Sequence, residues 1–176
     1  LGDVYKRQFY SCPYSNGNSW RPVKPVDGDT LYAKTMESFQ MRNVTPEYFR
    51  LFRIQTNDGG QVYDKIKGRH NAIVITPEMA EGFYHGAPNI VGRRVYHSEN
   101  EQTSEIAAVS TSIRSNEYER PEASFYQCLE GEIFNSVVSG FGAERAEFCV
   151  RMKRAYTQDE MNRFLDGMGD RLTVNN

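Results

Sequence analysis

The sequence predicts an α+β fold, because stretches typical of short strands alternate with stretches typical of short helices. Residues 72–75 read Ala-Ile-Val-Ile, an apolar run with the length and composition of a strand buried on both faces. Residues 146–153 alternate apolar and polar side chains, as a strand with one buried face does. Residues 157–168 place apolar side chains at helical spacing behind a capping box, so they predict an amphipathic helix.

Composition limits the classes of protein to consider. The chain has 176 residues, of which 39% are hydrophobic and 25% are charged. This is enough for a core in one domain or two small lobes, and it argues against a disordered chain. A net charge of −2 gives no electrostatic reason to expect nucleic-acid binding. No apolar run reaches the roughly 18 residues that cross a bilayer.

Residues that could carry catalysis occur without the spacing that the chemistry needs. His70, His85 and His97 do not pair at helical spacing, and we expect them to be polar surface residues. The sequence contains neither a phosphate-binding loop nor a serine-hydrolase elbow. We therefore expect no enzymatic activity, no cofactor and no bound metal.

The three cysteines, Cys12, Cys128 and Cys149, lie far apart. They form no C-x-x-C pair, so nothing supports a zinc site or a thioredoxin-like redox pair. An odd number cannot pair completely, and we expect them to act as small hydrophobic side chains. One disulfide stays open as an alternative.

Residues 1–8 look foreign to the rest of the chain. Residues 3–8 read Asp-Val-Tyr-Lys-Arg-Gln, which is similar to the translated end of a common transposase-based sequencing adapter. We expect residues 1–8 to be a non-native tail that contributes nothing to the fold. The N-terminal part of the native domain is then expected to be missing.

Residues 9–44 predict a loop followed by a strand. Residues 9–28 are rich in Pro, Ser, Asn and Gly, which favours loop with one short strand at most. We expect Trp20 in this segment to be a lid packed on the core. Apolar side chains of one parity predict a half-buried strand over residues 30–44, with a break near residues 35–37.

Two copies of a Thr-Pro-Glu start predict two short helices. Thr45 and Thr76 are expected to cap them, because a threonine hydroxyl accepts hydrogen bonds from first-turn amides. Proline suits the first helical position, and glutamate suits the positive end of the helix dipole. The turn Asn-Asp-Gly-Gly at residues 57–60 ends the first helix, and Gly86 ends the second.

The remaining segments predict further strands and one longer helix. Residues 93–97 and 105–113 are expected to be strands joined by a charged loop at residues 98–103, and residues 124–129 form another strand. The helix that begins at Thr157 is expected to end at Gly169, before a last edge strand at residues 172–174. The apolar stripe of this helix is Met161, Phe164, Leu165 and Met168.

The order of these elements resembles a known family. Residues 44–49 read Val-Thr-Pro-Glu-Tyr-Phe, a buried strand leads into a helix over residues 71–86, and residues 90–95 read Ile-Val-Gly-Arg-Arg-Val. In this order the chain is similar to the extracytoplasmic core domain of MacB/FtsX-type ABC transporter permeases. Two segments depart from the family pattern. Gly-Gly-Gln-Val-Tyr at residues 59–63 replaces G-R-x-F, and Ile-Ala-Ala-Val at residues 106–109 replaces V-V-G-V.

The resemblance implies a mixed-sheet domain with two lobes. Residues 9–44 would be the remnant of a first, βαβ-type lobe, and residues 45–113 would be a β-rich lobe inserted into it. Residues 114–176 would be the returning half of the first lobe.

The resemblance also implies a function. The domain would lie outside the bacterial inner membrane and would be moved by a cytoplasmic ATP-binding subunit, in a homodimeric or paired permease. An adaptor protein, or a peptide or lipoprotein cargo, would be its external partner, and no catalytic residues are implied. The candidate contact residues lie in two loops and are Asn57, Asp58, Gln61, Tyr63, Glu99 and Glu101.

Two other classes remain open from the sequence alone. The first is a free-standing extracytoplasmic binding module or a small α+β enzyme without a recognisable motif. An apolar cleft with converging polar groups would favour this class. The second is a purely structural surface domain.

Overall fold

A computed structural model describes residues 8–9, 19–26, 37–113, 118, 120–129, 146–147 and 155–173. The chain divides into two compact units, one of residues Tyr5–Cys149 and one of residues Leu1–Val4 with Val150–Asn176. The first unit holds the described strands and three helices. The second holds helix α5, Gln158–Thr173.

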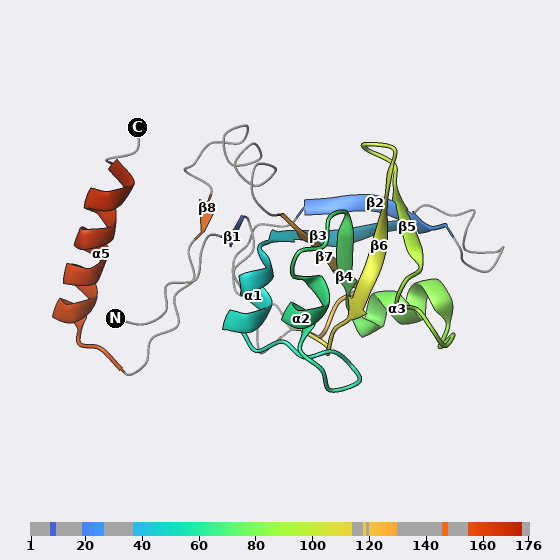
Figure 1. Ribbon diagram of the computed structural model, residues 1–176, viewed down its shortest axis with the longest axis horizontal. Coiled ribbons are helices and arrows are strands. Elements are labelled where there is room, and N and C mark those ends of the chain that lie inside the picture. The colour runs from blue at the N-terminus through green and yellow to red at the C-terminus, as the bar shows by residue number, and fades with distance from the viewer. Residues whose placement is uncertain are drawn as a thin grey trace. The chain divides into compact units, whose positions relative to one another are not determined.

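The described elements confirm the α+β class (Figure 1). The helices of the first unit are α1 (Pro46–Leu51), α2 (Val62–Ile66) and α3 (Pro77–Tyr84). The strands are β1 (Gln8–Phe9), β2 (Ser19–Pro25), β3 (Glu37–Val44), β4 (Ala72–Ile75), β5 (Arg94–His97), β6 (Gln102–Val109), β7 (Ser124–Cys128) and β8 (Ala146–Glu147).

Six of the described strands pair in a closed ring. Their order is β2-β5-β6-β4-β7-β3, and β3 pairs back onto β2. The sheet is mixed, as expected, because β3 runs parallel to β7 and β4 runs parallel to β6, while the other neighbours in the ring are antiparallel. The short strands β1 and β8 extend the sheet from β3.

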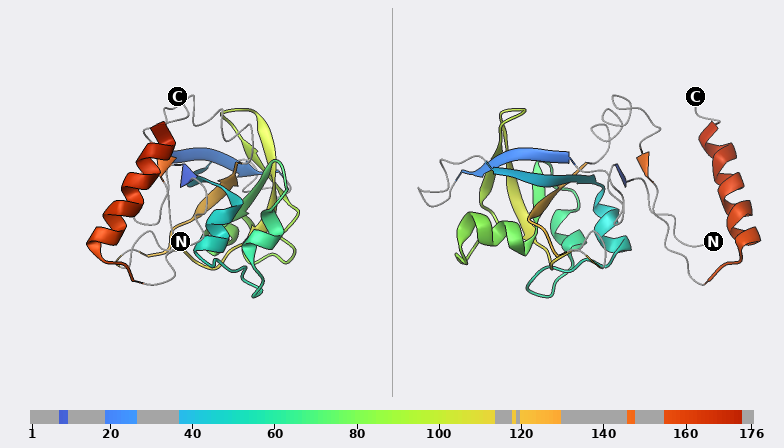
Figure 2. Two further views of the ribbon diagram at one scale, coloured as in Figure 1. Left: turned by 60° about the vertical axis from the view of Figure 1, so that its left-hand side comes forward. Right: turned by 180° about the vertical axis from the view of Figure 1, so that it is seen from behind.

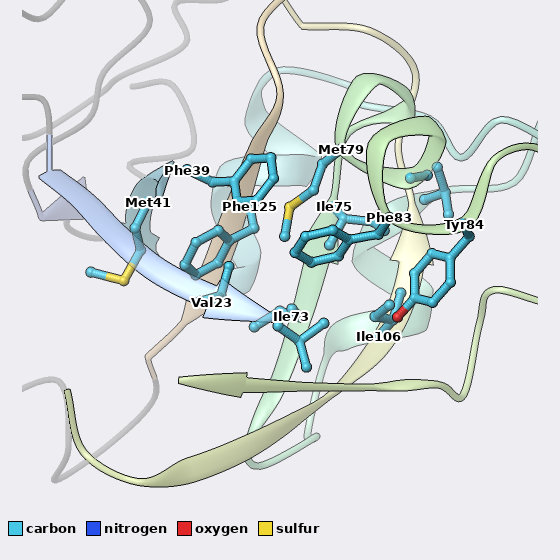
Figure 3. Close-up of a cluster of buried hydrophobic side chains, with 13 residues drawn as sticks. Val23, Phe39, Met41, Ile73, Ile75, Met79, Phe83, Tyr84, Ile106 and Phe125 are labelled. Atoms are coloured by element: carbon cyan, nitrogen blue, oxygen red, sulfur yellow. The ribbon is translucent and has the colours of Figure 1, made fainter. Parts of the chain in front are cut away.

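The inside of this ring is filled by one apolar cluster, which we call the inner core (Figure 3). Each ring strand contributes to it, and α3 adds the face that it turns toward the strands. Phe39 of β3 and Phe83 of α3 meet edge to face, with ring centroids 4.9 Å apart. The buried members are Val23, Phe39, Met41, Ile73, Ile75, Met79, Ala80, Phe83, Tyr84, Val95, Ile106, Val109 and Phe125.

Helices α1 and α2 lie side by side and cover the other face of the sheet (Figures 1 and 2). This second cluster is the outer core. Its central strand is again β4, whose alternate side chains point the opposite way from those in the inner core. The buried members are Val44, Tyr48, Phe49, Ile54, Val62, Ile66, Ala72, Val74, Ala107, Ala108 and Tyr126.

A β-bulge in β6 lets one strand serve both cores. Ile73 pairs with Ile106 but Val74 pairs with Ala108, so Ala107 has no partner in the ladder. The extra residue reverses the alternation. Ile106 and Val109 therefore both reach the inner core, although three positions separate them and a regular strand would place them on opposite faces.

Strand β2 closes the ring although it contains Pro22 and Pro25. The N–H and C=O of one strand residue point to the same neighbour, so a proline fits where that neighbour needs no donor. The Pro22 oxygen accepts from Ser98 N at 3.3 Å, which places its missing N–H beside β5 just beyond the last residue of that strand. Pro25 faces β3 beyond their last pair, Val23 with Glu37.

Several expectations for the first unit are wrong. Trp20 is part of β2 and is 53% exposed, so it is not a lid on the core. Thr76 accepts from Met79 N at 3.5 Å as a cap should, but Thr45 makes no such bond. Strand β6 begins at Gln102 rather than residue 105, which shortens the preceding loop. Helix α2 had not been predicted at all.

Helix α5 begins as predicted and ends later. Thr157 N donates to Glu160 Oε2 at 2.9 Å and Glu160 N donates to Thr157 Oγ1 at 3.3 Å, which is the expected capping box. The helix continues past Gly169 to Thr173, so the last strand expected at residues 172–174 is wrong for the described part. Met161 and Phe164 are half-buried rather than buried.

Some expectations lie outside the described residues. These are the side chains of Leu165 and Met168, Cys12 and Cys149, residues 148–153, and residues 1–7 of the foreign tail. Gln8, the last residue of that tail, pairs with Glu147. The two-lobe division is not confirmed, and the boundaries at residues 44 and 113 stay predictions; β3 and β7, on either side of them, share one sheet with β4.

The inner core predicts the cost of removing Phe83. This side chain is 2% exposed, so Phe83→Ala should lower the free energy of unfolding by about 3–5 kcal/mol through lost burial and a cavity. Phe52→Ala is the matched control, because Phe52 is 38% exposed and its loss should cost less than about 1.5 kcal/mol. Urea denaturation of both variants measures the difference. Equal losses would contradict the assigned packing.

Candidate functional site

The first predicted contact loop joins α1 to α2 and is tied to the end of β6. Thr56 and Ser110 form a β-bridge, and Asn57 N donates to Val109 O at 3.0 Å. Thr56 N donates to Gly60 O at 2.8 Å, and Gly59 takes a φ of 89° that favours glycine. The loop therefore has a defined conformation, with the Asn57 side chain exposed at its tip.

Asp58 holds this loop together. Its Oδ1 accepts from the Thr56 hydroxyl and from Gly60 N, the latter at 3.4 Å. The Thr56 hydrogen bond is the main reason that the pKa of Asp58 is lowered, because it stabilises the charged carboxylate. Asp58 is exposed, so it combines a structural role with the predicted contact role.

Tyr63 on α2 lies between two cations. The Arg50 guanidinium carbon is 5.2 Å from the ring centroid and the Lys67 Nζ is 5.4 Å from it. Lys67 also pairs with Asp64 at 3.0 Å. Tyr63 is half-buried against the outer core, and Gln61 beside it is exposed. This end of the sheet thus offers polar, cationic and aromatic groups together.

The second predicted contact loop is the β5–β6 hairpin. Glu99 Oε1 lies 2.5 Å from Arg21 Nη1 of β2, in a partly exposed ion pair. Glu101 is exposed and adopts a φ of 55°, in the left-handed region that tight turns use. Asn100 Oδ1 accepts from Gln102 N at 3.2 Å, which closes the turn.

The two loops lie at opposite ends of β6. The hairpin leads into Gln102, while Asn57 is bonded to Val109, seven residues further along the strand. At a rise of about 3.3 Å per residue, roughly 23 Å separates the two ends. The six candidate residues therefore do not form one site, and the structure places them in two groups.

The sequence reasoning missed His97, which is not a surface residue. It is 8% exposed, its Nε2 is 2.9 Å from Ser104 Oγ, and its ring meets Phe125 edge to face at 5.7 Å. Burial lowers the pKa of His97, and the nearby Glu99 carboxylate opposes this shift. The available signal was parity, since His97 lies two positions after Val95 in the same strand.

A polar group is also buried beside the outer core. Arg42 Nη2 donates to Gln40 Oε1 at 2.9 Å, and both side chains are buried. Burial raises the pKa of Tyr126 to about 12 and raises that of Tyr48 well above its usual value. Both phenols thus stay protonated at neutral pH, and neither can act as a base.

Two negative findings apply to the described part of the chain. No group of three or more His, Cys, Asp or Glu residues there could hold a metal ion. None of the helices there is long and apolar enough to cross a membrane.

The structure is similar to two solved permease domains. One is a domain assigned to a permease protein of Porphyromonas gingivalis, with a TM-score of 0.65 and 14% identity, covering 97% of this chain and 71% of that chain. The other is the periplasmic region of MacB from Actinobacillus actinomycetemcomitans, with a TM-score of 0.60 and 12% identity, covering 96% of this chain and 67% of that chain. The chain has the fold of an extracytoplasmic permease domain.

This likeness confirms the resemblance inferred from the sequence at the level of fold. No family model matches the sequence, and no curated protein matches it either. The likeness therefore shows that the chain and these permease domains share an arrangement of helices and strands. It does not carry over their activity or their partners.

Thr76 is expected to be the most costly helix cap to remove in this unit. Its hydroxyl accepts from Ser124 N at 3.1 Å as well as from Met79 N, and it donates to Glu122 O at 3.2 Å. Thr76→Val keeps the shape but leaves these buried groups unpaired, so it should cost about 2–3 kcal/mol. Thr76→Ser keeps the hydroxyl and should cost less than about 1 kcal/mol. Chemical denaturation compares them, and equal costs would show that the hydroxyl does not matter.

Charge reversal should separate Glu99 from Glu101. Glu101→Lys should change the free energy of unfolding by less than about 0.5 kcal/mol, as at ordinary surface sites. Glu99→Lys breaks the ion pair with Arg21 and should cost up to about 1 kcal/mol. Combining it with Arg21→Glu should restore most of the loss. If the double variant is no more stable than Glu99→Lys, the ion pair contributes nothing.

Proposed function

We propose that the chain is the extracytoplasmic domain of an ABC transporter permease. The observation that carries this proposal is the likeness of fold to two permease domains over nearly the whole chain. The order of motifs in the sequence points to the same family independently, through the Val-Thr-Pro-Glu-Tyr-Phe helix start and the Val-Gly-Arg-Arg-Val strand. The domain then lies outside the bacterial inner membrane.

In this proposal the domain couples motion at the membrane to a partner outside it. A cytoplasmic ATP-binding subunit drives the membrane helices of a homodimeric or paired permease, and the domain follows them. The separation of the two loops along β6 supports such a role, because β6 is packed against both the inner and the outer core and its two ends therefore move together. One loop can then face the permease while the other meets an adaptor protein or a peptide or lipoprotein cargo.

The test places a single cysteine at each end of β6 in the full-length protein. Glu101→Cys and Asn57→Cys, made after replacing Cys12, Cys128 and Cys149 by Ser, should both react with a membrane-impermeant maleimide on intact spheroplasts. Ile106→Cys is the buried control and should not react. If the cysteines at both exposed positions react only after the spheroplasts are lysed, the domain lies on the cytoplasmic side.

The same labelled proteins test the coupling role. A bulky label at the loop that meets the partner should reduce transport, or ATP hydrolysis by the co-purified ATP-binding subunit, without changing the amount of folded protein. If labels at both loops leave transport and ATP hydrolysis unchanged, the loops are connections only and the coupling role fails, even if the location is right.

A further inference from the structure

The ring of strands has two short ladders, β4–β7 and the seam between β2 and β5, and of these two only the β2–β5 seam has no described residue in the outer core. The register of this seam comprises three pairs, Val23 with His97, Lys24 with Tyr96 and Pro25 with Val95. By comparison, β2 and β3 share five pairs. On the β5 side Pro22 cannot donate, and only its oxygen is used, by Ser98 N and by the Ser98 hydroxyl, each at 3.3 Å.

An ion pair crosses the seam beyond its last ladder pair, on the side of the β5–β6 turn. Arg21 belongs to β2 and Glu99 to the β5–β6 hairpin, and their 2.5 Å contact ties the hairpin to the strand. The two side chains are 34% and 46% exposed, so solvent weakens the pair. The hairpin is therefore held to β2 by a short ladder and a screened charge contact.

The side chain directly beneath the seam is a histidine. His97 occupies the last pair of the β2–β5 ladder and turns inward, against the Phe125 ring and the Ser104 hydroxyl. A neutral imidazole can accept a hydrogen bond from that hydroxyl or donate one to it, whereas an imidazolium can only donate. Its charge would also have to be buried beside an aromatic ring.

Among the described residues, few charges face His97. Glu99 of the hairpin is the carboxylate that interacts with it, while Phe125 on β7 and Ser104 on β6 carry no charge. Across the ring Glu37 stands at the exposed end of β3, opposite Val23. The other titratable or charged groups on β2, β3, β5, β6 and β7 are Arg21, Lys24, Arg42, Arg94, Tyr96, Glu105, Tyr126 and Cys128.

We propose that the β2–β5 seam is an acid-sensitive opening point, at which protonated His97 leaves the interior and the β5–β6 hairpin separates from β2. The Glu99 carboxylate at the surface draws the imidazolium outward. Burial in the closed ring lowers the pKa of His97, whereas in the open state the ring is hydrated and titrates near its usual value of about 6.5. The open state therefore binds the proton more tightly.

The sign of the effect follows from this difference. Above about pH 6.5 neither state is protonated and pH has no effect on the seam. As the pH falls below that value the open state gains a proton first, so closure becomes less favourable until the folded pKa is reached. At pH 5.5, one unit below the usual histidine pKa of about 6.5, the equilibrium constant for opening is raised by up to about tenfold over its value at neutral pH.

Hydrogen exchange of backbone amides in the 176-residue chain tests the proposal. After correction for intrinsic exchange, the amides of Val26 and Ser98, which bond across the seam to Arg94 and Pro22, should lose protection several-fold between pH 7.5 and 5.5, while the amides of β4 should not. His97→Gln should abolish this change, and His70→Gln, an exposed histidine, should leave it intact. Equal pH dependence in wild type and His97→Gln would overturn the proposal, as would parallel loss of protection in β4.

A second measurement covers the case in which His97→Gln does not fold. In the wild-type chain the His97 imidazole resonance should titrate together with the loss of protection at the seam. Titration of His97 with the seam still protected would overturn the proposal. Neither result depends on the permease assignment, because membrane location and transport are not part of the readout.

Discussion

Strand β4 is buried on both faces, and the rest of the first unit is arranged to keep it so. Ile73 and Ile75 point into the ring, while Ala72 and Val74 point toward α1 and α2. A four-residue strand without a solvent face needs a partner on each edge and a cover on each side. β6 and β7 supply the edges, α3 with the far strands of the ring supplies one cover, and the helix pair α1–α2 supplies the other.

Because β4 and its neighbours are covered in this way, the six candidate contact residues lie outside the doubly covered part of the sheet. The bulge at Ala107 lets β6 serve both cores, and the end of β6 is bonded to the loop before α2 through Asn57 N and Val109 O. Two exposed loops are thereby fixed at opposite ends of one stiff strand. The candidate residues of these loops are therefore held apart and do not converge on one place.

Local patterns predicted the elements that depend on local interactions. The β4 run, the Thr76 cap and the Thr157 capping box could each be read from a few neighbouring residues. Features that depend on distant partners could not. The ring closure through the proline-containing β2 and the bulge at Ala107 are decided by strand pairing, which leaves no local signature. The inward position of His97, by contrast, follows from its parity with Val95. Gly169 predicted a helix end, but one glycine costs only about 1 kcal/mol and α5 continues through it.

The departures from the family pattern meet at one place in the structure. Val62 and Ile66, in and after the segment that replaces G-R-x-F, lie on α2 and are buried in the outer core. Ala107 and Ala108, in the segment that replaces V-V-G-V, belong to the same cluster. The small side chains of β6 and the larger ones of α2 thus share one core, and cores tolerate exchanges of apolar side chains when the total volume is kept. A fold can therefore persist at 12–14% identity, because packing constrains the sum of side chains at each contact more strongly than any single one.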